Sequence, residues 1–556
     1  MNAPRTAPHP VTHRPRRRPR RRPGRRPGRR PGRRALAAFA ATAVALPLLL
    51  AANGGPATAA GAGGDPGKKG DRLAAKLVKR TSDRGAMRHL HAFQAIARVS
   101  DGHRGAGSAG HERSARYAGA LLRAAGYKVT YQKFRFTYRE TLAEKLTVRS
   151  PEQRDVPLKL MTYTKSTPQG GTEAPVAHVP VDADGTTGCE AEDYASGDYT
   201  GSIALIQRGV CSFAQKQAAA AEAGAVGAVI YNNEDGELGG TLGDPSAARV
   251  PTGGITQAAG EELAKLAAEG PVTVNLEVRE LQEERTTGNV LAETRGGDPD
   301  NVVMVGAHLD SVSEGPGIND NASGSAGVLE TALQLARADR RGRHANTVRF
   351  ALWGAEELGL KGSEHYVEGL SAAERERIAL YLNFDMIASP NYGLFAYDGD
   401  DSDGTGSGPG PEGSAQLEKD ITDFLASRGQ QVRGADFDGR SDYGPFIEAG
   451  IPAGGSKTGA EGIKTAEEAR LWGGTAGEAY DPCYHQACDD LRNVNRTALG
   501  LNAKVIANAV GHYAWDTSPV TGDAKRTADR RTSAAPGADR APDGSGPRHR
   551  GGLLVR

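Results

Sequence analysis

Apolar residues in the first half of the chain recur with two different periods. Between residues 71 and 98 they return every three or four positions, which predicts a helix. A second helix is expected over 116–125, and it should end at Gly126. Alternation of apolar and polar residues then predicts a strand over 127–134, and a further strand begins at 146–148.

Later in the chain, apolar strands alternate with helices. Val302–Val305 is a β-branched, apolar run that predicts a buried strand, and His308 and Asp310 follow it closely. The pattern then continues through a helix over 323–338, strands over 347–353 and 380–384, and helices after Leu360, over 414–428 and over 497–513. This alternation predicts an α/β layered sheet, whose strand ends are the usual place for chemistry.

Residues 151–280 have a pattern of their own, which predicts an inserted domain. Residues 202–206 form a short apolar strand, and an Arg-Gly-Val-Cys-Ser-Phe turn and an Ala-rich helix follow. A strand over 224–233, Gly-Ala-Val-Gly-Ala-Val-Ile-Tyr-Asn-Asn, comes next, and residues 250–255 come later. This order resembles the protease-associated domain; a plain α/β insertion is the alternative. The segment lacks the density of His, Asp and Glu that catalysis needs.

The two ends of the chain differ in composition from the middle. Residues 1–34 contain 14 arginines and no acidic residue, and an apolar stretch and a small-residue Ala-Thr-Ala-Ala site follow them. This order predicts a secretory signal over 1–60, by the general or the twin-arginine route, although a nucleic-acid-binding arm is the alternative. Without these 14 arginines the formal net charge of +2 becomes −12, so the mature protein is acidic. Residues 518–556 have almost no large apolar residue, which predicts a disordered tail.

Four cysteines remain in the exported protein, and export makes disulfides plausible. Four cysteines allow three pairings. Proximity in the sequence favours Cys189–Cys211 and Cys483–Cys488, and free buried thiols are the alternative.

Five short segments carry residues that could bind metal ions. They contain His308 with Asp310, Asp320, the pair Glu356–Glu357, Asp385, and His485. Two histidines and three carboxylates suit a pair of zinc ions. Adjacent glutamates cannot both point at one metal from a regular strand or helix, so we expect one ligand and one base. A water between two zinc ions is acidic enough to become a nucleophile near neutral pH.

Together these motifs resemble a known family. The segments AHLDSV, GPGINDNASGSAGVLE, WGAEELGLKGSEHY, YLNFDMI, GRSDYGPF and WGGTAGEAYDPCYHQACD are similar to those of the co-catalytic dizinc aminopeptidases of metallopeptidase family twenty-eight. The closest resemblance is to the secreted aminopeptidase S type of Streptomyces-like bacteria, and it covers about 71–150 and 286–517. It implies the zinc exopeptidase fold, a three-layer mixed β-sheet sandwiched by helices, with two Zn²⁺ per chain.

The resemblance also implies a role for each residue of the site. Zinc ligands are His308 and Asp385 for one ion, Glu357 and His485 for the other, and Asp320 as the bridge. Glu356 is the general base, Asp310 orients His308, and Tyr484 binds the oxyanion. Substrate contacts are expected from Arg440 and Met386. The Asp320–Asn321 bond is expected to be cis, and the Cys483–Cys488 bond closes a loop that fixes Tyr484 and His485.

One segment departs from the family pattern. After Gly454–Gly455 the aminopeptidase S type is apolar and aromatic and lines the pocket for the first side chain, but here residues 456–459 are Ser-Lys-Thr-Gly. We hypothesise that Lys457 makes this pocket less apolar and favours acidic N-terminal residues. Alternatively, the Lys457 ammonium reaches solvent over an unchanged pocket.

The sequence therefore predicts a secreted dizinc aminopeptidase that acts on peptides with a free N-terminus. We expect a discontinuous peptidase domain over 61–150 and 281–517, and a protease-associated domain over 151–280. The protein is expected to be a monomer without nucleic-acid partners or stable membrane association. Two alternatives stay open: a dizinc carboxypeptidase or dipeptidase of the same superfamily, and a non-catalytic binding protein.

Overall fold

The structure is a computed structural model that describes residues 65–182, 185–405 and 408–522. The predicted signal segment lies outside these residues, as does the tail beyond residue 522. Residues 518–522 are helical and Val520 is buried in the core, so the expectation of disorder from residue 518 is wrong there. Val520 packs in the core and Ser518 donates to Asp516, two local contacts that the composition of the tail as a whole does not reveal. None of the helices within the described ranges is long and apolar enough to cross a membrane.

Three helices precede the sheet: α1 (Pro66–Arg80), α2 (Asp83–Arg98) and α3 (Ala109–Ala124). The single helix expected over 71–98 is therefore broken in two. Thr81 has an extended backbone, and the hydroxyl of Ser82 accepts a hydrogen bond from the Gly85 amide, which caps α2. The apolar period continues across the break, so periodicity alone does not locate it.

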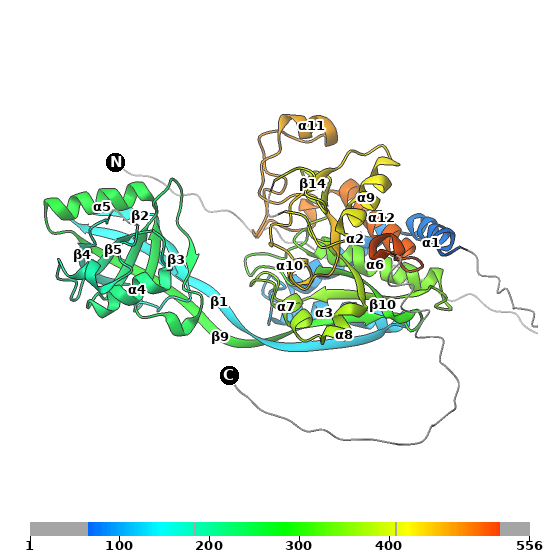
Figure 1. Cartoon of the computed structure of the whole chain (residues 1–556), viewed down its shortest axis with the longest axis horizontal. Coiled ribbons are helices and arrows are strands. Elements are labelled where there is room, and N and C mark those ends of the chain that lie inside the picture. The colour runs from blue at the N-terminus through cyan, green and yellow to red at the C-terminus, as the bar shows by residue number, and fades with distance from the viewer. Residues whose placement is uncertain (1–64, 183–184, 406–407, 523–556) are drawn as a thin grey trace, which may run out of the picture. The chain divides into compact units, whose positions relative to one another are not determined.

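The strands of the main domain lie side by side in one mixed sheet (Figure 1). Their order is β14-β13-β15-β12-β10-β11-β9, with β10 parallel to both β11 and β12. The bounds are β9 (Thr273–Glu293), β10 (Asp298–His308), β11 (Asn346–Trp353), β12 (Ile378–Phe384), β13 (Phe395–Tyr397), β14 (Arg433–Ala435) and β15 (Ala453–Lys457). The central strand β10 is the apolar run that the sequence predicts.

Alternate side chains of these strands enter two separate cores. Val303 and Val305 of β10 pack in the larger core with α2, α3, α6 (Ala322–Ala338), α9 (Ser414–Ala426) and α12 (Arg496–Tyr513). Val302 and Met304 point the other way, toward residues of α7 (Lys361–Glu368) and α10 (Gly444–Glu448). Two short helices, α8 (Ala372–Arg377) and α11 (Ala466–Trp472), complete the domain. The sheet thus lies between two helical layers, which confirms the three-layer α/β fold.

A long antiparallel ribbon joins the main domain to the inserted one. It consists of β1 (Lys128–Ser150) and β9, which pair from Lys128↔Glu293 to Ser150↔Thr273 with two irregularities. The two strands expected over 127–134 and from 146 are therefore a single strand. Polar residues between them interrupt the apolar pattern, because the middle of the ribbon is exposed to solvent and needs no apolar face.

The inserted domain has its own cores and a largely parallel arrangement of strands. Strands β4, β5, β6 and β8 pair in parallel in that order, and Figure 1 labels β4 and β5 within the inserted domain. Bounds are β2 (Arg154–Val156), β3 (Lys159–Thr162), β4 (Thr172–His178), β5 (Ile203–Gln207), α4 (Phe213–Glu222), β6 (Gly227–Tyr231), β7 (Gly240–Thr241), β8 (Thr252–Ile255) and α5 (Gln257–Glu269). Two clusters of buried apolar residues lie within it. The Cys189–Cys211 disulfide forms here as predicted.

Candidate active site

Three of the predicted ligand segments meet because they follow adjacent parallel strands. His308 is the last residue of β10, Glu356 and Glu357 lie just beyond the end of β11, and Asp385 follows β12 directly. The carboxyl ends of parallel neighbours lie at one edge of a sheet, so these side chains converge there.

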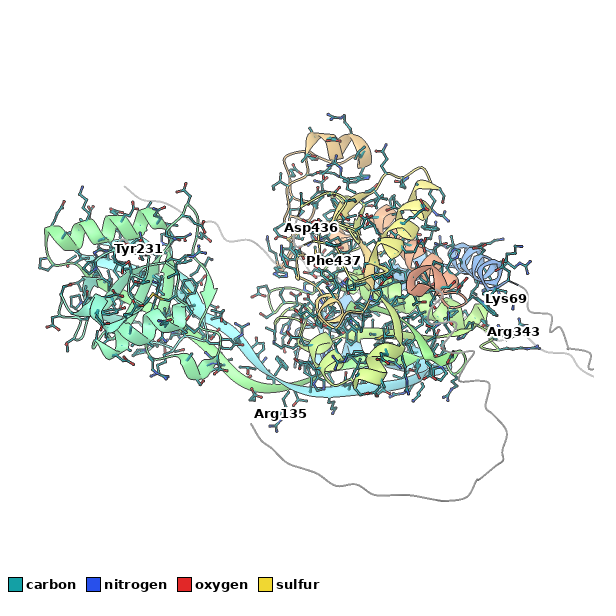
Figure 2. All side chains as sticks on the ribbon, viewed as in Figure 1. Lys69, Arg135, Tyr231, Arg343, Asp436 and Phe437 are labelled. Carbon is teal, nitrogen blue, oxygen red and sulfur yellow. A yellow bond between two sulfur atoms is a disulfide. The ribbon has the colours of Figure 1, made fainter. Side chains whose placement is uncertain are left out.

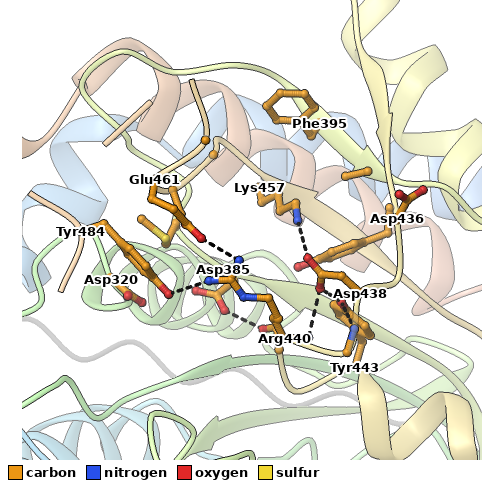
Figure 3. A pocket seen from close by; sticks show the side chains of 18 of the residues that line it. Asp320, Asp385, Phe395, Asp436, Asp438, Arg440, Tyr443, Lys457, Glu461 and Tyr484 are labelled. Carbon is orange, nitrogen blue, oxygen red and sulfur yellow. Dashed lines mark hydrogen bonds and ion pairs between the residues drawn. The ribbon is translucent and has the colours of Figure 1, made fainter. Parts of the chain in front are cut away.

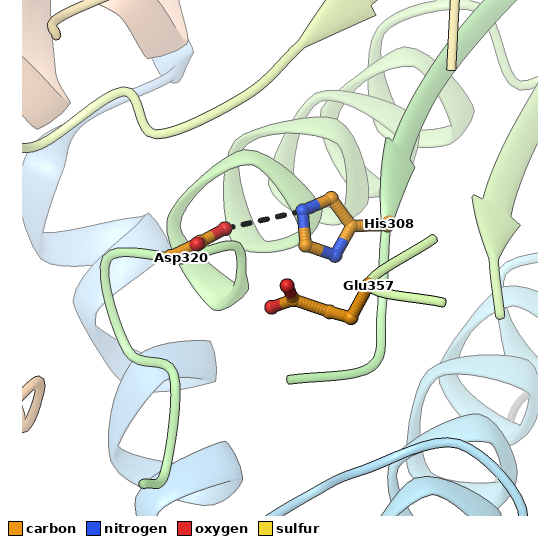
Figure 4. Close-up of side chains that lie close together, drawn as sticks. All are labelled: His308, Asp320 and Glu357. Atoms are coloured by element: carbon orange, nitrogen blue, oxygen red, sulfur yellow. Dashed lines mark ion pairs between the residues drawn. The ribbon is translucent and has the colours of Figure 1, made fainter. Parts of the chain in front are cut away.

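The side chains form two groups that share Asp320. The Nε2 atom of His308 lies 3.2 Å from Asp320 Oδ1 and 3.3 Å from Asp385 Oδ1. The Nε2 atom of His485 lies 3.2 Å from Asp320 Oδ2 and 3.0 Å from Glu357 Oε2. Each oxygen of Asp320 therefore faces a different histidine, and Figure 4 shows Asp320 turned toward His308 beside Glu357.

The donor set fits metal ions. Burial, together with the negative charge of Asp320, raises the pKa of Glu357 to about 7. Two buried carboxylate oxygens of the cluster, Glu357 Oε1 and Asp385 Oδ1, lack hydrogen-bond partners among the described residues. Buried carboxylates that crowd together are costly unless cations balance them. Imidazole and carboxylate donors in groups of three suit zinc.

Neighbouring residues hold the ligands in place. Asp310 is fully buried, and its Oδ1 lies 3.8 Å from His308 Nδ1. This is the ring nitrogen that faces away from the cluster. The same oxygen accepts a hydrogen bond from the Glu356 amide. These contacts place Asp310 where it can orient the ring of His308. The Asp320–Asn321 peptide bond is cis.

A chain of hydrogen bonds leads to Asp385, and the sequence did not predict it. Each link donates toward the carboxylate: Trp353 Nε1 to Tyr381, Tyr381 to Asn383, Asn383 to Ser441, and Ser441 to Asp385 Oδ2 at 2.6 Å. The chain occupies Oδ2 and leaves Oδ1 facing His308. Ser441 lies inside the GRSDYGPF motif, and this motif was the feature of the sequence that could have pointed to it.

Asp489 is a second residue whose role the sequence alone does not predict. Its two oxygens accept hydrogen bonds from the amides of Asn319 and Asp320, at 2.8 and 2.9 Å. Because Asp489 directly follows Cys488, it ties Asp320 to the loop of His485. The Cys483–Cys488 disulfide closes that loop, as predicted.

Tyr484 and Arg440 lie beside the cluster (Figure 3). The guanidinium of Arg440 donates to the Tyr484 hydroxyl at 3.2 Å and to Glu461 Oε1 at 2.7 Å. Burial, with the charges of Asp320 and Glu357, raises the pKa of Tyr484, so the phenol remains a hydrogen-bond donor at neutral pH.

One cavity of about 760 Å³ contains nearly all of the predicted site. The predicted ligands, Glu356, Tyr484, Arg440, Met386 and Lys457 line it; Asp310 lies behind His308. Phe395, Tyr397 and Tyr480 are aromatic residues that also line this cavity. The Lys457 ammonium lies 3.7 Å from Asp438 Oδ2, and Figure 3 shows it turned toward that carboxylate. The charge of Lys457 is therefore paired.

A mixed sheet with two sets of histidine and carboxylate ligands around a shared aspartate defines a metal-dependent hydrolase. The model of peptidase family M28 matches residues 289–510, and that of the PA domain matches 172–263. The probable lipoprotein aminopeptidase LpqL of Mycobacterium tuberculosis is 45% identical over 80% of this chain and 87% of its own length. The chain belongs to peptidase family M28, as an aminopeptidase with an inserted PA domain.

Solved structures resemble both domains together. The aminopeptidase from Aneurinibacillus sp. strain AM-1 is 29% identical, with a TM-score of 0.60 over 79% of this chain and 95% of that one. BSAP, a zinc aminopeptidase from Bacillus subtilis, is 26% identical, with a TM-score of 0.52 over 77% of this chain and 94% of that one. BSAP is described as a zinc enzyme, and the donor set of this chain also suits zinc.

Proposed function

We propose that this aminopeptidase binds two zinc ions per chain and removes N-terminal residues by metal-assisted hydrolysis. Asp320 carries the proposal, because its two oxygens each lie 3.2 Å from a histidine of a different ligand group. His308 and Asp385 would hold one ion, Glu357 and His485 the other, and Asp320 both.

Glu356 is the general base in this proposal. Two zinc ions at this site would acidify a water and polarise the scissile carbonyl. The Glu356 carboxylate lies 3.7 Å from His308 Nε2 and lines the cavity, within reach of a nucleophile above the cluster. It would take the proton of the attacking water and pass it to the leaving amine.

Tyr484 and Arg440 would act on the substrate. The Tyr484 hydroxyl would donate a hydrogen bond to the oxyanion of the tetrahedral intermediate. Arg440 holds that hydroxyl and would contact bound substrate or product. The first side chain of the substrate would extend toward Met386, Phe395 and Lys457. Because Asp438 already pairs with Lys457, we favour uncharged over acidic side chains there.

Release of free amino acids from Leu-Ala peptides tests this function. We expect hydrolysis of the peptide with a free amine, loss of activity with a chelator, and recovery on addition of zinc. The N-acetylated peptide should not be cleaved. Cleavage of the acetylated peptide would instead indicate a carboxypeptidase or endopeptidase, and bound zinc without any activity would contradict the proposal.

We also infer that the enzyme is secreted and monomeric. The signal pattern over 1–60 and the two disulfides, Cys189–Cys211 and Cys483–Cys488, support export. N-terminal sequencing of protein from the culture medium should place the mature start near residue 60. Light scattering of that protein should give the mass of one chain.

A further inference from the structure

Arg104 is a buried arginine whose guanidinium contacts backbone carbonyls. It lies in the segment between α2 and α3, and its side chain is fully buried. Its guanidinium donates three hydrogen bonds, all to backbone carbonyl oxygens: Pro316 at 2.8 Å, Gly317 at 2.6 Å, and Leu309. Within the described ranges no carboxylate lies within ion-pair distance of it.

These three carbonyls belong to the loop that joins two predicted zinc ligands. The loop runs from Leu309 to Asn319, between His308 and Asp320. The Arg104 amide also donates to the Ser311 hydroxyl at 2.9 Å. The loop is tight at Gly317, where φ is +57° and a Cβ would lie 2.2 Å from the Asp320 carbonyl oxygen.

The charge of Arg104 complements the acidic cluster. Burial lowers the pKa of Arg104 to about 10, and the charges of Asp310, Asp489, Asp320 and Glu357 oppose that shift. The guanidinium therefore stays charged at neutral pH. At the Asp320 end of the loop, Asp489 accepts hydrogen bonds from the amides of Asn319 and Asp320. A cation thus binds the carbonyls of the loop, and an anion binds its amides.

We propose that Arg104 is a positioning residue for the metal site, which fixes the loop between His308 and Asp320 at the spacing that zinc requires. The proposal rests on the zinc chemistry proposed above. It assigns to the N-terminal segment, which contributes none of the predicted metal ligands, a direct part in building the metal site. Residues that hold metal ligands typically change metal affinity 10- to 100-fold when they are replaced.

Zinc affinity of the folded protein tests the proposal. Arg104→Met removes the charge and all three hydrogen bonds, and we expect zinc affinity to fall about 10- to 100-fold in competition with a chromogenic chelator. Arg104→Lys keeps the charge but cannot reach all three carbonyls, so its affinity should lie between those of Arg104→Met and the wild type. The visible spectrum of the cobalt-substituted protein should also change, because the ligand geometry changes.

Arg349→Met is the matched control. Arg349 is half-buried and donates to Glu293 and Tyr366, and it lies in the middle of β11, four residues before the strand ends at Trp353. We expect this variant to lose stability and keep wild-type zinc affinity and the cobalt spectrum. If Arg104→Met folds and binds zinc as tightly as the wild type, the proposal is wrong. If Arg104→Met does not fold, a wild-type zinc affinity in Arg104→Lys overturns the proposal instead. A wild-type enzyme that binds no zinc would overturn the proposed function as well.

Discussion

Two adjacent glutamates, just beyond the end of β11, face different histidines. Ala355, just before them, has a positive φ of 59°, which turns the chain sharply after β11. Glu356 then lies 3.7 Å from His308, whereas Glu357 lies 3.0 Å from His485. The sequence predicted that one would be a ligand and the other a base, since a regular element cannot aim both at one metal.

These two roles predict different effects for two conservative variants, one on kcat and the other on zinc affinity. Glu356→Gln should lower kcat about 10²- to 10⁴-fold, because the amide cannot take a proton. It should keep its zinc, measured by metal analysis of the purified protein. Glu357→Gln should lose zinc affinity first and activity as a consequence. Wild-type kcat in zinc-loaded Glu356→Gln would exclude Glu356 as the base.

The ion pair between Lys457 and Asp438 changes the specificity expected for the cavity. The sequence suggested that the Lys457 charge favours acidic first residues, but Asp438 lies 3.7 Å from the ammonium. Asp438 also accepts a hydrogen bond from the Tyr443 hydroxyl at 2.5 Å, which holds the carboxylate in place. The pairing could not be read from the sequence, since Asp438 lies 19 positions earlier in a loop.

Removal of that pairing should change specificity. In Asp438→Asn the Lys457 charge is released, and we expect the ratio of glutamyl to leucyl hydrolysis to rise about tenfold, equivalent to about 1.4 kcal/mol. Chromogenic glutamyl and leucyl substrates measure it. Asp436→Asn is the control, because Asp436 lines the same cavity and hydrogen-bonds Thr405 instead. If the gain persists after Lys457→Met is added, Lys457 is not its cause.

At the scale of elements, the sequence predicts what periodicity and local order encode. The strand before His308 and the helix after Asp320 were predictable because apolar residues repeat with the period of each element. Contacts between distant segments were not. Arg104 is 205 residues from Leu309, and no local pattern distinguishes it from an exposed arginine. The role of Asp489 depends on two amides 169 and 170 positions away.

Helix α3 carries a buried histidine that should make stability depend on pH. Burial, with a contribution from the charge of Arg104, lowers the pKa of His111 to about 4, and its Nδ1 lies 3.0 Å from the Thr287 hydroxyl. Between pH 6.5 and 4 the unfolded chain therefore binds a proton at His111 that the folded chain does not bind. The contribution of neutral His111 to the free energy of unfolding is fully present above pH 6.5. It falls by about 1.4 kcal/mol per pH unit as the pH decreases toward 4.

Replacement of His111 should remove this part of the pH dependence. We expect His111→Gln to lose less stability than the wild type between pH 6.5 and 4.5, measured by urea unfolding in the presence of chelator. His91→Gln, at an exposed position of α2, is the control and should follow the wild type. Parallel curves for His111→Gln and the wild type would contradict the assignment.

At the scale of the molecule, the inserted domain is separable from the site. All predicted ligands lie between His308 and His485, and the apolar cores of the two domains are separate clusters. The β1–β9 ribbon is a regular antiparallel pair near Arg139↔Gln282. A two-residue Asn-Gly turn can close such a ribbon, because its backbone twist matches that of the strands.

We therefore expect a variant with residues 140–281 replaced by Asn-Gly to fold, bind zinc and cleave leucyl chromogenic substrate with kcat/KM close to that of the wild type. Loss of zinc in this variant would show that the inserted domain supports the site itself. If the variant keeps its zinc, its kcat/KM on a longer peptide shows whether the inserted domain limits access to the cavity or helps to hold peptides. If the inserted domain limits access to the cavity, the shortened enzyme should gain kcat/KM on the long peptide while its rate on the small substrate is unchanged. If the domain instead helps to hold peptides, the long peptide alone should lose kcat/KM.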